Sequence, residues 1–314
     1  MRSRSDTVAA DAETFARKVT EAHARPSREI LTINTPRRKW NDGRTRPEHL
    51  WIPDTQVRAG VPIEHIRWAA QYAIDKRPDV ILTGNDWWDF PSLNAHEVEW
   101  ADFRTRDLAD DVLSGLHAWD LFIGTLRKAK DYDPLIVFVE GNHDQRFRRQ
   151  YRYDVRTKRC LRGPRSFVKE TPGVVWLPLE EVACIDGIHY SHYFVSNVGR
   201  PLGGTSLHKL NKLKFSYTMG HQQGLDSSLQ HLANGRVLRG LVAGSFYQHD
   251  EEYRGAMGNV SHWRGLIYKH EVREGTYDLM EVSLDYLRRV YGGPVVEASG
   301  QYRADEFTVE DDDR

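Results

Sequence analysis

Short apolar runs alternate with amphipathic stretches through the first half of the chain. Residues 49–53 (HLWIP) and 79–84 (DVILTG) are predicted to be buried strands, and residues 62–76 between them carry apolar side chains at helical spacing. This order predicts a β-α-β unit with parallel strands. A longer helix is predicted over 108–126 from its one-sided apolar residues, and it leads into a third apolar run at 135–140 (LIVFVE).

The second half of the chain has a different pattern. Its strand-like runs are short and are separated by Gly, Asn and Pro, which favour turns. These runs are VVWLP, GIHYSHYFVS, RVLRGLVAG, GLIYKHEV and LMEVSL. We therefore expect an α/β fold in which an α/β first half leads into a β-rich second half, packed as a layered sandwich.

The two ends of the chain lack this pattern. Residues 1–46 are predicted to be an N-terminal helical and basic extension, with helical spacing over 11–24 followed by prolines and the basic segment PRRKWNDGRTRP. Residues 301–314 are predicted to be a solvated acidic tail. The main domain is expected to occupy residues 47–300.

Composition excludes several classes of protein. With 39% apolar and 28% charged residues the chain is typical of globular proteins, and its 44 basic and 45 acidic residues give no overall charge signal for nucleic acid. No apolar stretch approaches the roughly 18 residues of a spanning helix, and the polar start lacks a signal-peptide centre, so we expect a cytoplasmic protein without membrane contact. Cys160 and Cys184 are too few for a disulfide framework or a thiolate zinc site, which turns attention to the 14 histidines.

Polar clusters follow the apolar runs. Parallel-sheet proteins bind ligands at the carboxyl ends of their strands. Since carboxylates, amides and imidazoles all ligate metals, such clusters predict a metal site across one edge of a sheet. In chain order the clusters are Asp54-Thr55-Gln56, Asn85-Asp86-Trp87-Trp88-Asp89, Gly141-Asn142-His143-Asp144, His192 and Gly220-His221-Gln222-Gln223.

These clusters resemble the calcineurin-like metallophosphoesterase superfamily, whose pattern is DxH, GDxxD, GNH[DE], a lone His and GHxH. The blocks occur here in the same order over roughly residues 50–225, and GNHD after a strand is the most specific of them. The later segments SHWRG and EGTYDLMEVSL look like the end of family variants common in phage-type genomes. The resemblance implies a four-layer α/β/β/α sandwich with mixed sheets.

Three positions depart from the family pattern. Asn85 stands where the family has the Gly of GD, a change expected to alter only the turn. Gln56 replaces the His of DxH, and Gln223 replaces the second His of GHxH. By resemblance both glutamines belong to the same metal position, so their paired change suggests a retuned site.

The resemblance implies two divalent ions that share an aspartate. Oxygen donors suit Mn²⁺ or Mg²⁺ better than Zn²⁺ or Fe, so Mn²⁺ is the predicted metal. Carried over residue by residue, one ion would be held by Asp86, Asn142, His192 and His221, and the other by Asp54, Gln56, Asp86 and Gln223.

The same resemblance assigns roles in phosphoester hydrolysis. Two ions sharing Asp86 would activate a water for in-line attack on phosphorus. His143 would protonate the leaving oxygen as a general acid, and Asp89 would orient its imidazole. Apart from the resemblance, the basic stretch after GNHD predicts that Arg146 reaches the site and binds substrate.

Several residues have a plain alternative. His189 and His192 lie three apart in a strand, so only one can face the site, and the family pattern favours His192. Trp87, Trp88 and Phe90 could line a substrate cleft or pack in the core. Surface or packing roles are expected for the histidines His49, His65, His96, His117 and His231.

A basic stretch follows GNHD directly. Residues 145–169 contain eight arginines and two lysines against one acid, with aromatic residues interleaved. Such a segment could hold a phosphate backbone through arginine and stacked rings, or it could be a solvated helix face.

The leading hypothesis is therefore a metal-dependent phosphoesterase, more a phosphodiesterase or nuclease than a monoesterase, with nucleic acid as the first substrate to test. Cyclic nucleotides and phosphorylated proteins stay open. The alternative is a catalytically weakened member of the fold that serves as an interaction module, as Gln56 and Gln223 would allow. In a third case, only the histidine-bearing position binds metal tightly and the second ion arrives with substrate.

Overall fold

The computed structural model describes residues 30–33, 35, 45–153, 163–250 and 255–293. The helix predicted over 11–24 and the acidic tail lie outside the described residues. The described residues from Leu31 onward belong to one compact unit. The predicted segment boundaries at 46 and 300 stay predictions.

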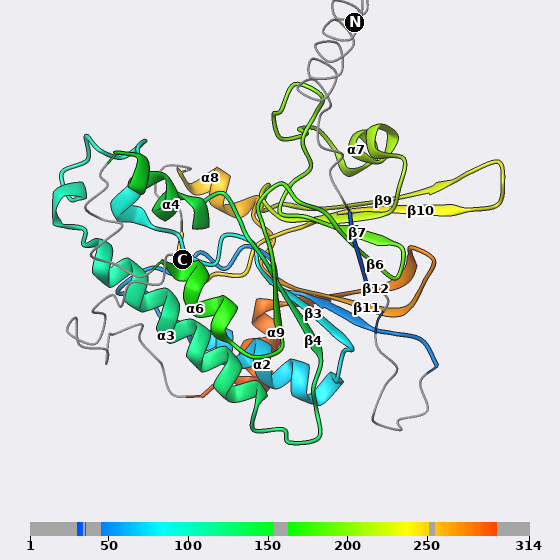
Figure 1. Cartoon of the computed structure of the whole chain (residues 1–314), viewed down its shortest axis with the longest axis horizontal. Helices are drawn as coiled ribbons and strands as arrows, with labels where there is room; N and C mark the ends of the chain where they lie inside the picture. Colours follow the sequence, from blue (N-terminus) through cyan, green and yellow to red (C-terminus); the bar gives the residue numbers. More distant parts are fainter. Residues whose placement is uncertain (1–29, 34, 36–44, 154–162, 251–254, 294–314) are drawn as a thin grey trace, which may run out of the picture. The chain divides into compact units, whose positions relative to one another are not determined.

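Two six-stranded mixed sheets form the centre of this unit (Figure 1). The first sheet has the order β12-β11-β2-β3-β4-β5, with β2 to β5 parallel and β11 antiparallel to both of its neighbours. Its strands are β2 (His49–Trp51), β3 (Val80–Gly84), β4 (Leu135–Val139), β5 (Val174–Leu177), β11 (Gly265–Arg273) and β12 (Thr276–Ser283). The predicted β-α-β unit is confirmed as β2, α2 (Glu64–Lys76) and β3.

The second sheet has the order β1-β6-β7-β8-β10-β9. Its strands are β1 (Leu31–Ile33), β6 (Ala183–Ile185), β7 (Ile188–Tyr190), β8 (Tyr217–Met219), β9 (Leu225–His231) and β10 (Val237–Ala243). Strand β1 pairs in parallel with β6 at the sheet edge. Those three residues lie in the segment predicted as an extension, and their short pattern gave no strand signal.

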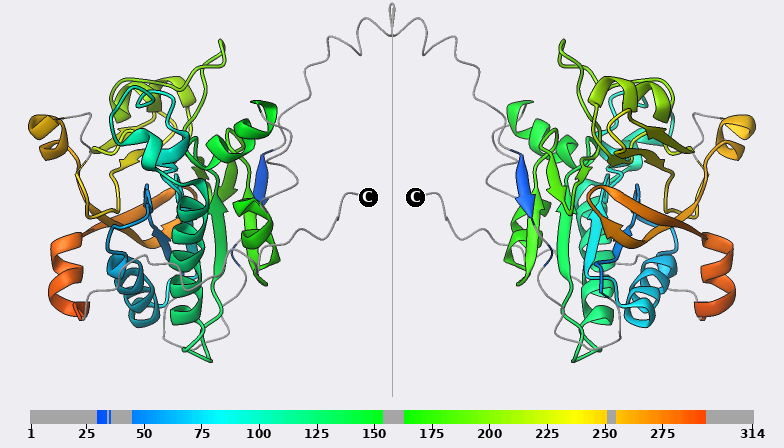
Figure 2. Two further views of the ribbon diagram at one scale, coloured as in Figure 1. Left: turned by 90° about the vertical axis from the view of Figure 1, so that its left-hand side faces the viewer. Right: turned by 90° about the vertical axis from the view of Figure 1, so that its right-hand side faces the viewer.

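Helices cover the outer face of each sheet (Figures 1 and 2). The first sheet carries α2, α3 (Leu108–Leu126), α6 (Pro164–Glu170) and α9 (Leu284–Tyr291), and the second carries α7 (Ser206–Leu213). The remaining helical segments are η1 (Pro91–Leu93), η2 (Phe103–Thr105), α4 (Asp144–Tyr153) and α8 (Gly255–Val260). None of the described helices is long and apolar enough to cross a membrane.

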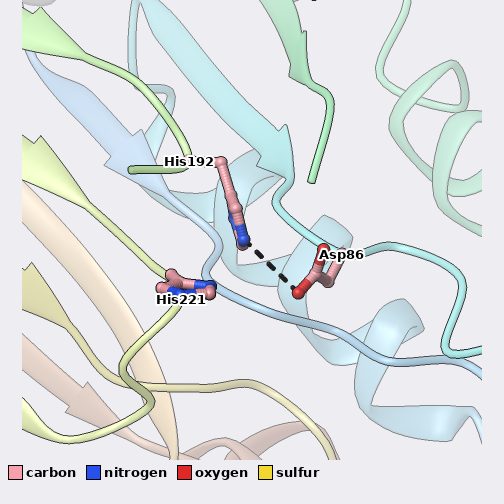
Figure 3. Close-up of side chains that lie close together, drawn as sticks. All are labelled: Asp86, His192 and His221. Carbon is pink, nitrogen blue, oxygen red and sulfur yellow. Dashed lines mark ion pairs between the residues drawn. The ribbon is translucent and has the colours of Figure 1, made fainter. Parts of the chain in front are cut away.

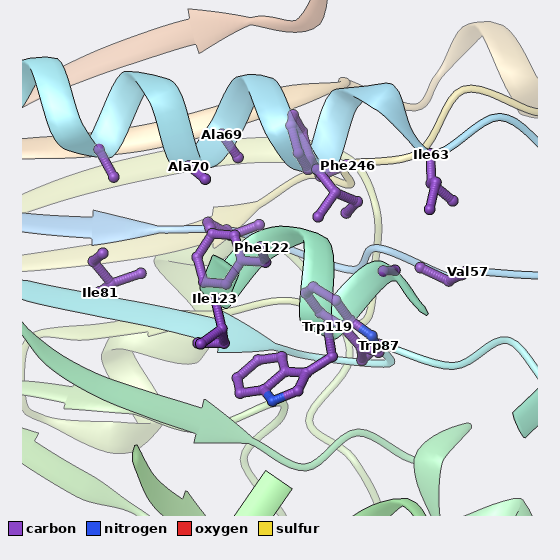
Figure 4. Close-up of a cluster of buried hydrophobic side chains, with 14 of the residues drawn as sticks. Val57, Ile63, Ala69, Ala70, Ile81, Trp87, Trp119, Phe122, Ile123 and Phe246 are labelled. Carbon is purple, nitrogen blue, oxygen red and sulfur yellow. The ribbon is translucent and has the colours of Figure 1, made fainter. Parts of the chain in front are cut away.

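Three hydrophobic cores separate these layers. Strand alternation explains the first two, since Leu50 points to the helices while Trp51 points to the second sheet. Figure 4 shows the core between the helices and the first sheet, where Ile81 of β3 meets Ala70 of α2 and Phe122 of α3. The third core lies beneath α7. The layers are therefore α/β/β/α, and the expected fold class is confirmed.

Trp87, Trp88 and Phe90 belong to the core rather than to a cleft. All three are completely buried. The indole nitrogen of Trp87 donates to the carbonyl of Gly115 at 2.9 Å, and that of Trp88 donates to the carbonyl of Val112 at 3.2 Å. Of the two alternatives, the structure supports packing. These rings anchor α3 against the loop that follows β3.

Candidate metal centre

Backbone hydrogen bonds bring the loops after the central strands side by side. The amide of Gln56 donates to the carbonyl of Asp86 at 2.8 Å, which aligns the loop after β2 with the loop after β3. The amide of His221, after β8, donates to both carboxylate oxygens of Asp54 at 3.1 Å. Residues more than 150 positions apart thus meet at one edge of the two sheets, as the sequence predicted.

Asp86, His192 and His221 form a triad at this edge (Figure 3). One ligand atom from each lies within 4.8 Å of the others. Nε2 of His192 is 3.4 Å from Oδ2 of Asp86 and 2.9 Å from Oδ1 of Asn142. The structure therefore brings together all four residues predicted for the first cation position.

The donor set fits a divalent cation. Burial lowers the pKa of His192 to about 3, although the charge of Asp86 opposes this shift, so the imidazole is neutral at pH 7. The amide oxygen of Asn142 and the carboxylate of Asp86 are both acceptors that point at this one ring nitrogen. A cation satisfies such converging lone pairs, and imidazole, amide and carboxylate are familiar ligands for transition metals.

Asp54 and Asp86 are both buried carboxylates, but their pKa values shift in opposite directions. Burial, followed by the charge of Asp86, raises the pKa of Asp54 well above its usual value. Burial alone would also raise the pKa of Asp86, but the nearby His192 and His143 outweigh it and lower that pKa. The charged forms of two neighbouring carboxylates repel each other, and a cation between them would stabilise both.

The residues predicted for the second cation position are also at this edge. Gln56 is 1% exposed, and neither its amide oxygen nor its amide nitrogen has a hydrogen-bond partner among the described residues. Gln223 is 4% exposed, and its Oε1 accepts a hydrogen bond from the Tyr247 hydroxyl at 3.3 Å. Asp54 is completely buried. A buried amide without partners is costly, so Gln56 also fits a site that takes a cation.

His143 and Asp89 form the predicted dyad beside the triad. Nδ1 of His143 lies 3.0 Å from Oδ1 of Asp89, and its Nε2 lies 4.0 Å from Oδ2 of Asp86. The backbone amide of His143 donates to Oδ1 of Asp86 at 2.7 Å. One imidazole is thus fixed at both its backbone and its ring, next to the shared carboxylate.

Two arginines flank this dyad. Nη2 of Arg58 lies 2.7 Å from Oδ2 of Asp89, while Nη1 of Arg146 donates to the Asp89 carbonyl at 2.7 Å. Burial would raise the pKa of Asp89, but Arg58, then His143 and Arg146, lower it below its usual value, so Asp89 stays ionised. Nη2 of Arg146 is also 3.1 Å from Nε2 of His143. Arg146 therefore contacts the dyad, while its role in binding substrate stays a prediction.

Two glycines make room for the carboxylates. A Cβ at Gly141 would lie 2.0 Å from Oδ1 of Asp86, and a Cβ at Gly220 would lie 2.2 Å from Oδ1 of Asp54. Both contacts are far below van der Waals separation. The Gly of GNHD and the Gly of the GHxH-like block are therefore required by close packing of backbone against carboxylate.

The loops of the site use left-handed backbone. Non-glycine residues with positive φ are uncommon, and strain of this kind tends to gather at functional sites. Five residues of these loops share this conformation: Gln56 (41°), Asn85 (53°), Asp86 (61°), His221 (68°) and Gln223 (61°). Position 85 thus takes a conformation that suits the glycine of the family pattern and that asparagine also tolerates.

Other histidines lie away from the site. Nδ1 of His189 is 3.1 Å from the carbonyl of Ser216, and His192 is the member of that pair that belongs to the triad. The sequence gave no signal for Arg58, which contacts Asp89, or for Tyr247, which contacts Gln223. Both come from loops outside the motifs, and only the tertiary fold brings them in.

The basic stretch after GNHD is described in part. Helix α4 contains Arg146, Arg148 and Arg149, of which the last two are exposed. Helix α6 follows, with Arg165 over the ring of Trp176 at 5.8 Å. Residues 154–162 lie outside the described residues. The described arginines leave both earlier interpretations, phosphate binding and a solvated face, open.

Comparison with known proteins gives little beyond this geometry. The sequence matches no family model and no curated protein. The fold is similar to the crystal structure of TT1561 of Thermus thermophilus, with a TM-score of 0.33 and 11% identity over 76% of this chain and 99% of that chain. Similarity at this level says nothing about activity, which has to be inferred from the residues of the site.

Proposed function

We propose that this chain is a metal-dependent phosphoesterase of the calcineurin-like type, acting on phosphodiesters. The observation that carries the proposal is the His143–Asp89 dyad, which lies beside Asp86 of the triad. A partly buried imidazole oriented by a carboxylate is suited to proton transfer. Its place next to a cluster of cation ligands suits the protonation of an oxygen that leaves phosphorus.

Two divalent cations, with Mn²⁺ as the first candidate, would complete the site. They would supply Lewis acidity at the phosphoryl oxygens and activate a water for attack. The residues that would hold them are Asp86, Asn142, His192 and His221 for one, and Asp54, Gln56, Asp86 and Gln223 for the other. The carboxylate of Asp86 would be shared.

The chain's own groups would handle the leaving group. Nδ1 of His143 is engaged by Asp89, which leaves Nε2 to carry the proton toward the leaving oxygen. In the structure Nε2 faces Nη2 of Arg146 instead. A bound phosphate would draw that guanidinium to its own oxygens, since arginine pairs with phosphate in a fork, and would free Nε2.

The preference for diesters rests on two features. A general acid contributes most when the leaving group is a basic alkoxide. Arg148 and Arg149 lie on the same helix as Arg146 and are exposed. Their guanidinium groups could therefore bind the phosphate that neighbours the scissile one. Nucleic acid is therefore the first natural substrate class to test.

Hydrolysis of bis(p-nitrophenyl) phosphate with Mn²⁺ tests the proposal. Asp86→Ala should abolish turnover together with cation binding. His143→Ala should keep the metal content and lower kcat by about 10²- to 10⁴-fold on a nucleic-acid diester, whose leaving group is a basic alkoxide, but by less on bis(p-nitrophenyl) phosphate, whose leaving group is a weak base. Loss of metal in His143→Ala would contradict its assigned role. Inactivity with Mn²⁺, Mg²⁺, Zn²⁺ and Fe²⁺ on esters and on nucleic acid would reject the enzyme in favour of the interaction module.

A further inference from the structure

The two cation positions have different chemistry, and this inference rests on the proposed function. We propose that the position formed by Asp54, Gln56 and Gln223 is an oxygen-only site that takes an exchangeable Mg²⁺ or Mn²⁺. The position that contains His192 and His221 instead retains a transition metal. The chain would then work with an unequal pair of ions joined through Asp86.

Gln56 carries the first step of this inference. Its amide is 1% exposed, and both of its polar atoms lack a hydrogen-bond partner within the described part of the chain. The backbone amide of Gln56 donates to the Asp86 carbonyl at 2.8 Å, which holds the loop that carries this side chain next to Asp86. An unpartnered buried polar group destabilises the fold, and a bound cation would remove that cost.

The second step concerns Gln223, whose amide oxygen accepts a hydrogen bond from Tyr247. The Tyr247 hydroxyl, in a residue 1% exposed, lies 3.3 Å from Oε1 of Gln223 and 2.5 Å from Nδ1 of His262. The ring of Tyr247 is stacked on His249 at 4.5 Å, and the Arg264 guanidinium lies 5.1 Å from its centroid. Tyr247 is therefore a positioning residue that fixes the amide plane of Gln223.

The donor atoms then separate the two positions. Around Asp54, the donors are carboxylate and amide oxygens, which suit Mg²⁺ and Mn²⁺ and discriminate against softer ions. Around His192, two imidazoles add nitrogen donors, which favour later transition metals. Hydrogen bonding from Tyr247 uses part of the basicity of the Gln223 oxygen, so the oxygen-only position should also be the weaker of the two.

Metal binding to the full-length chain tests this without any substrate. The chain is loaded with Mn²⁺, desalted, and analysed for metal content, and Mg²⁺ and Mn²⁺ are then titrated by calorimetry. We expect about one retained equivalent and a second, weaker class that accepts either ion. With two equivalents of Mn²⁺, electron paramagnetic resonance should show coupling between the ions, because both contact Asp86.

Variants that restore imidazoles provide the sharper comparison. The double variant Gln56→His and Gln223→His should turn the weak class into one that retains Zn²⁺ through desalting. Both positions have positive φ, which histidine tolerates. The matched control is Gln230→His on β9, which adds an imidazole at a residue bonded to Asn211 and should retain no extra Zn²⁺. Tyr247→Phe should weaken the second class about tenfold, as loss of an outer contact does at metal sites, and leave the first unchanged.

Each outcome decides the inference. Binding of only one equivalent of any cation at millimolar concentration would overturn it, as would a double variant that retains no more Zn²⁺ than the unmodified chain. Different results would contradict the proposed function. Two unequal classes of cation in a chain that cleaves no phosphoester would reject the function and keep the inference, whereas ester cleavage with a single equivalent would do the reverse.

Discussion

Gly141→Ala is the substitution that probes the site most directly by geometry. The new Cβ would lie 2.0 Å from Oδ1 of Asp86 and 2.1 Å from its backbone nitrogen, whereas real Cβ contacts stay beyond 3.0 Å. The Asp86 loop must therefore move by about 1 Å, the difference between these distances. Cation ligands tolerate shifts of only about 0.2 Å, so the variant should lose cation affinity.

The same clash should lower stability. Overpacking a close-packed region costs about 1–3 kcal/mol, which corresponds to a fall in Tm of roughly 2–10 °C at this chain size. Thermal unfolding with and without Mn²⁺, together with calorimetric titration, measures both effects. The expected result is a lower Tm that Mn²⁺ no longer raises as it does in the unmodified chain.

A matched control separates the clash from the added methyl group. Gly124 lies on the exposed face of α3, where a Cβ would meet nothing within 4 Å. Gly124→Ala should therefore stabilise the chain by about 0.5–1 kcal/mol, through helix propensity. If Gly141→Ala unfolds at the temperature of the unmodified chain and binds Mn²⁺ equally well, the close packing of Gly141 on Asp86 is refuted.

Two further predictions concern regions outside the site. Gly115 lies in the same helix as Gly124, but a Cβ at this position would fall 1.7 Å from the Trp88 indole nitrogen. Gly115→Ala should therefore lower the stability of the chain, whereas Gly124→Ala raises it. Chemical denaturation measures both changes, and two variants of equal stability would contradict the packing of Trp88. Burial, then the charge of His249, lowers the pKa of His65 from 6.5 to about 3. The unfolded chain therefore binds more protons between these values, and the free energy of unfolding should fall as the pH drops from 6.5, by up to about 1.4 kcal/mol per pH unit from this group. His65→Phe keeps the edge contact with Phe246 and should flatten that slope between pH 6.5 and 5 in urea titrations, whereas an unchanged slope would show that other groups cause it.

Much of the fold follows from local pattern. The helices over 62–76 and 108–126 were predicted because their apolar residues repeat at helical spacing, and the buried runs at 79–84 and 135–140 are confirmed as β3 and β4. Strand β1 was missed, because three residues in an otherwise basic segment carry no periodicity and pair only through tertiary contact with β6.

The residues of the site also fall into a group that the sequence could predict and a group that it could not. Asp54, Asp86, Asn142, His192 and His221 could be placed because each follows a strand or a recognisable motif, and strand ends converge in a layered sheet. Arg58, Tyr247 and His262 could not be placed, since their roles depend on which side chain happens to face Asp89 or Gln223 across the fold.

The left-handed backbone of the site limits how its metal chemistry can be changed by mutation. At positive φ a β-branched side chain collides with its own backbone, so valine, isoleucine and threonine are unsuitable at positions 56 and 223. Histidine, asparagine, aspartate and glycine tolerate this conformation. A directed-evolution library aimed at new metal preferences can therefore be restricted at these two codons to unbranched ligating residues and glycine without losing foldable candidates.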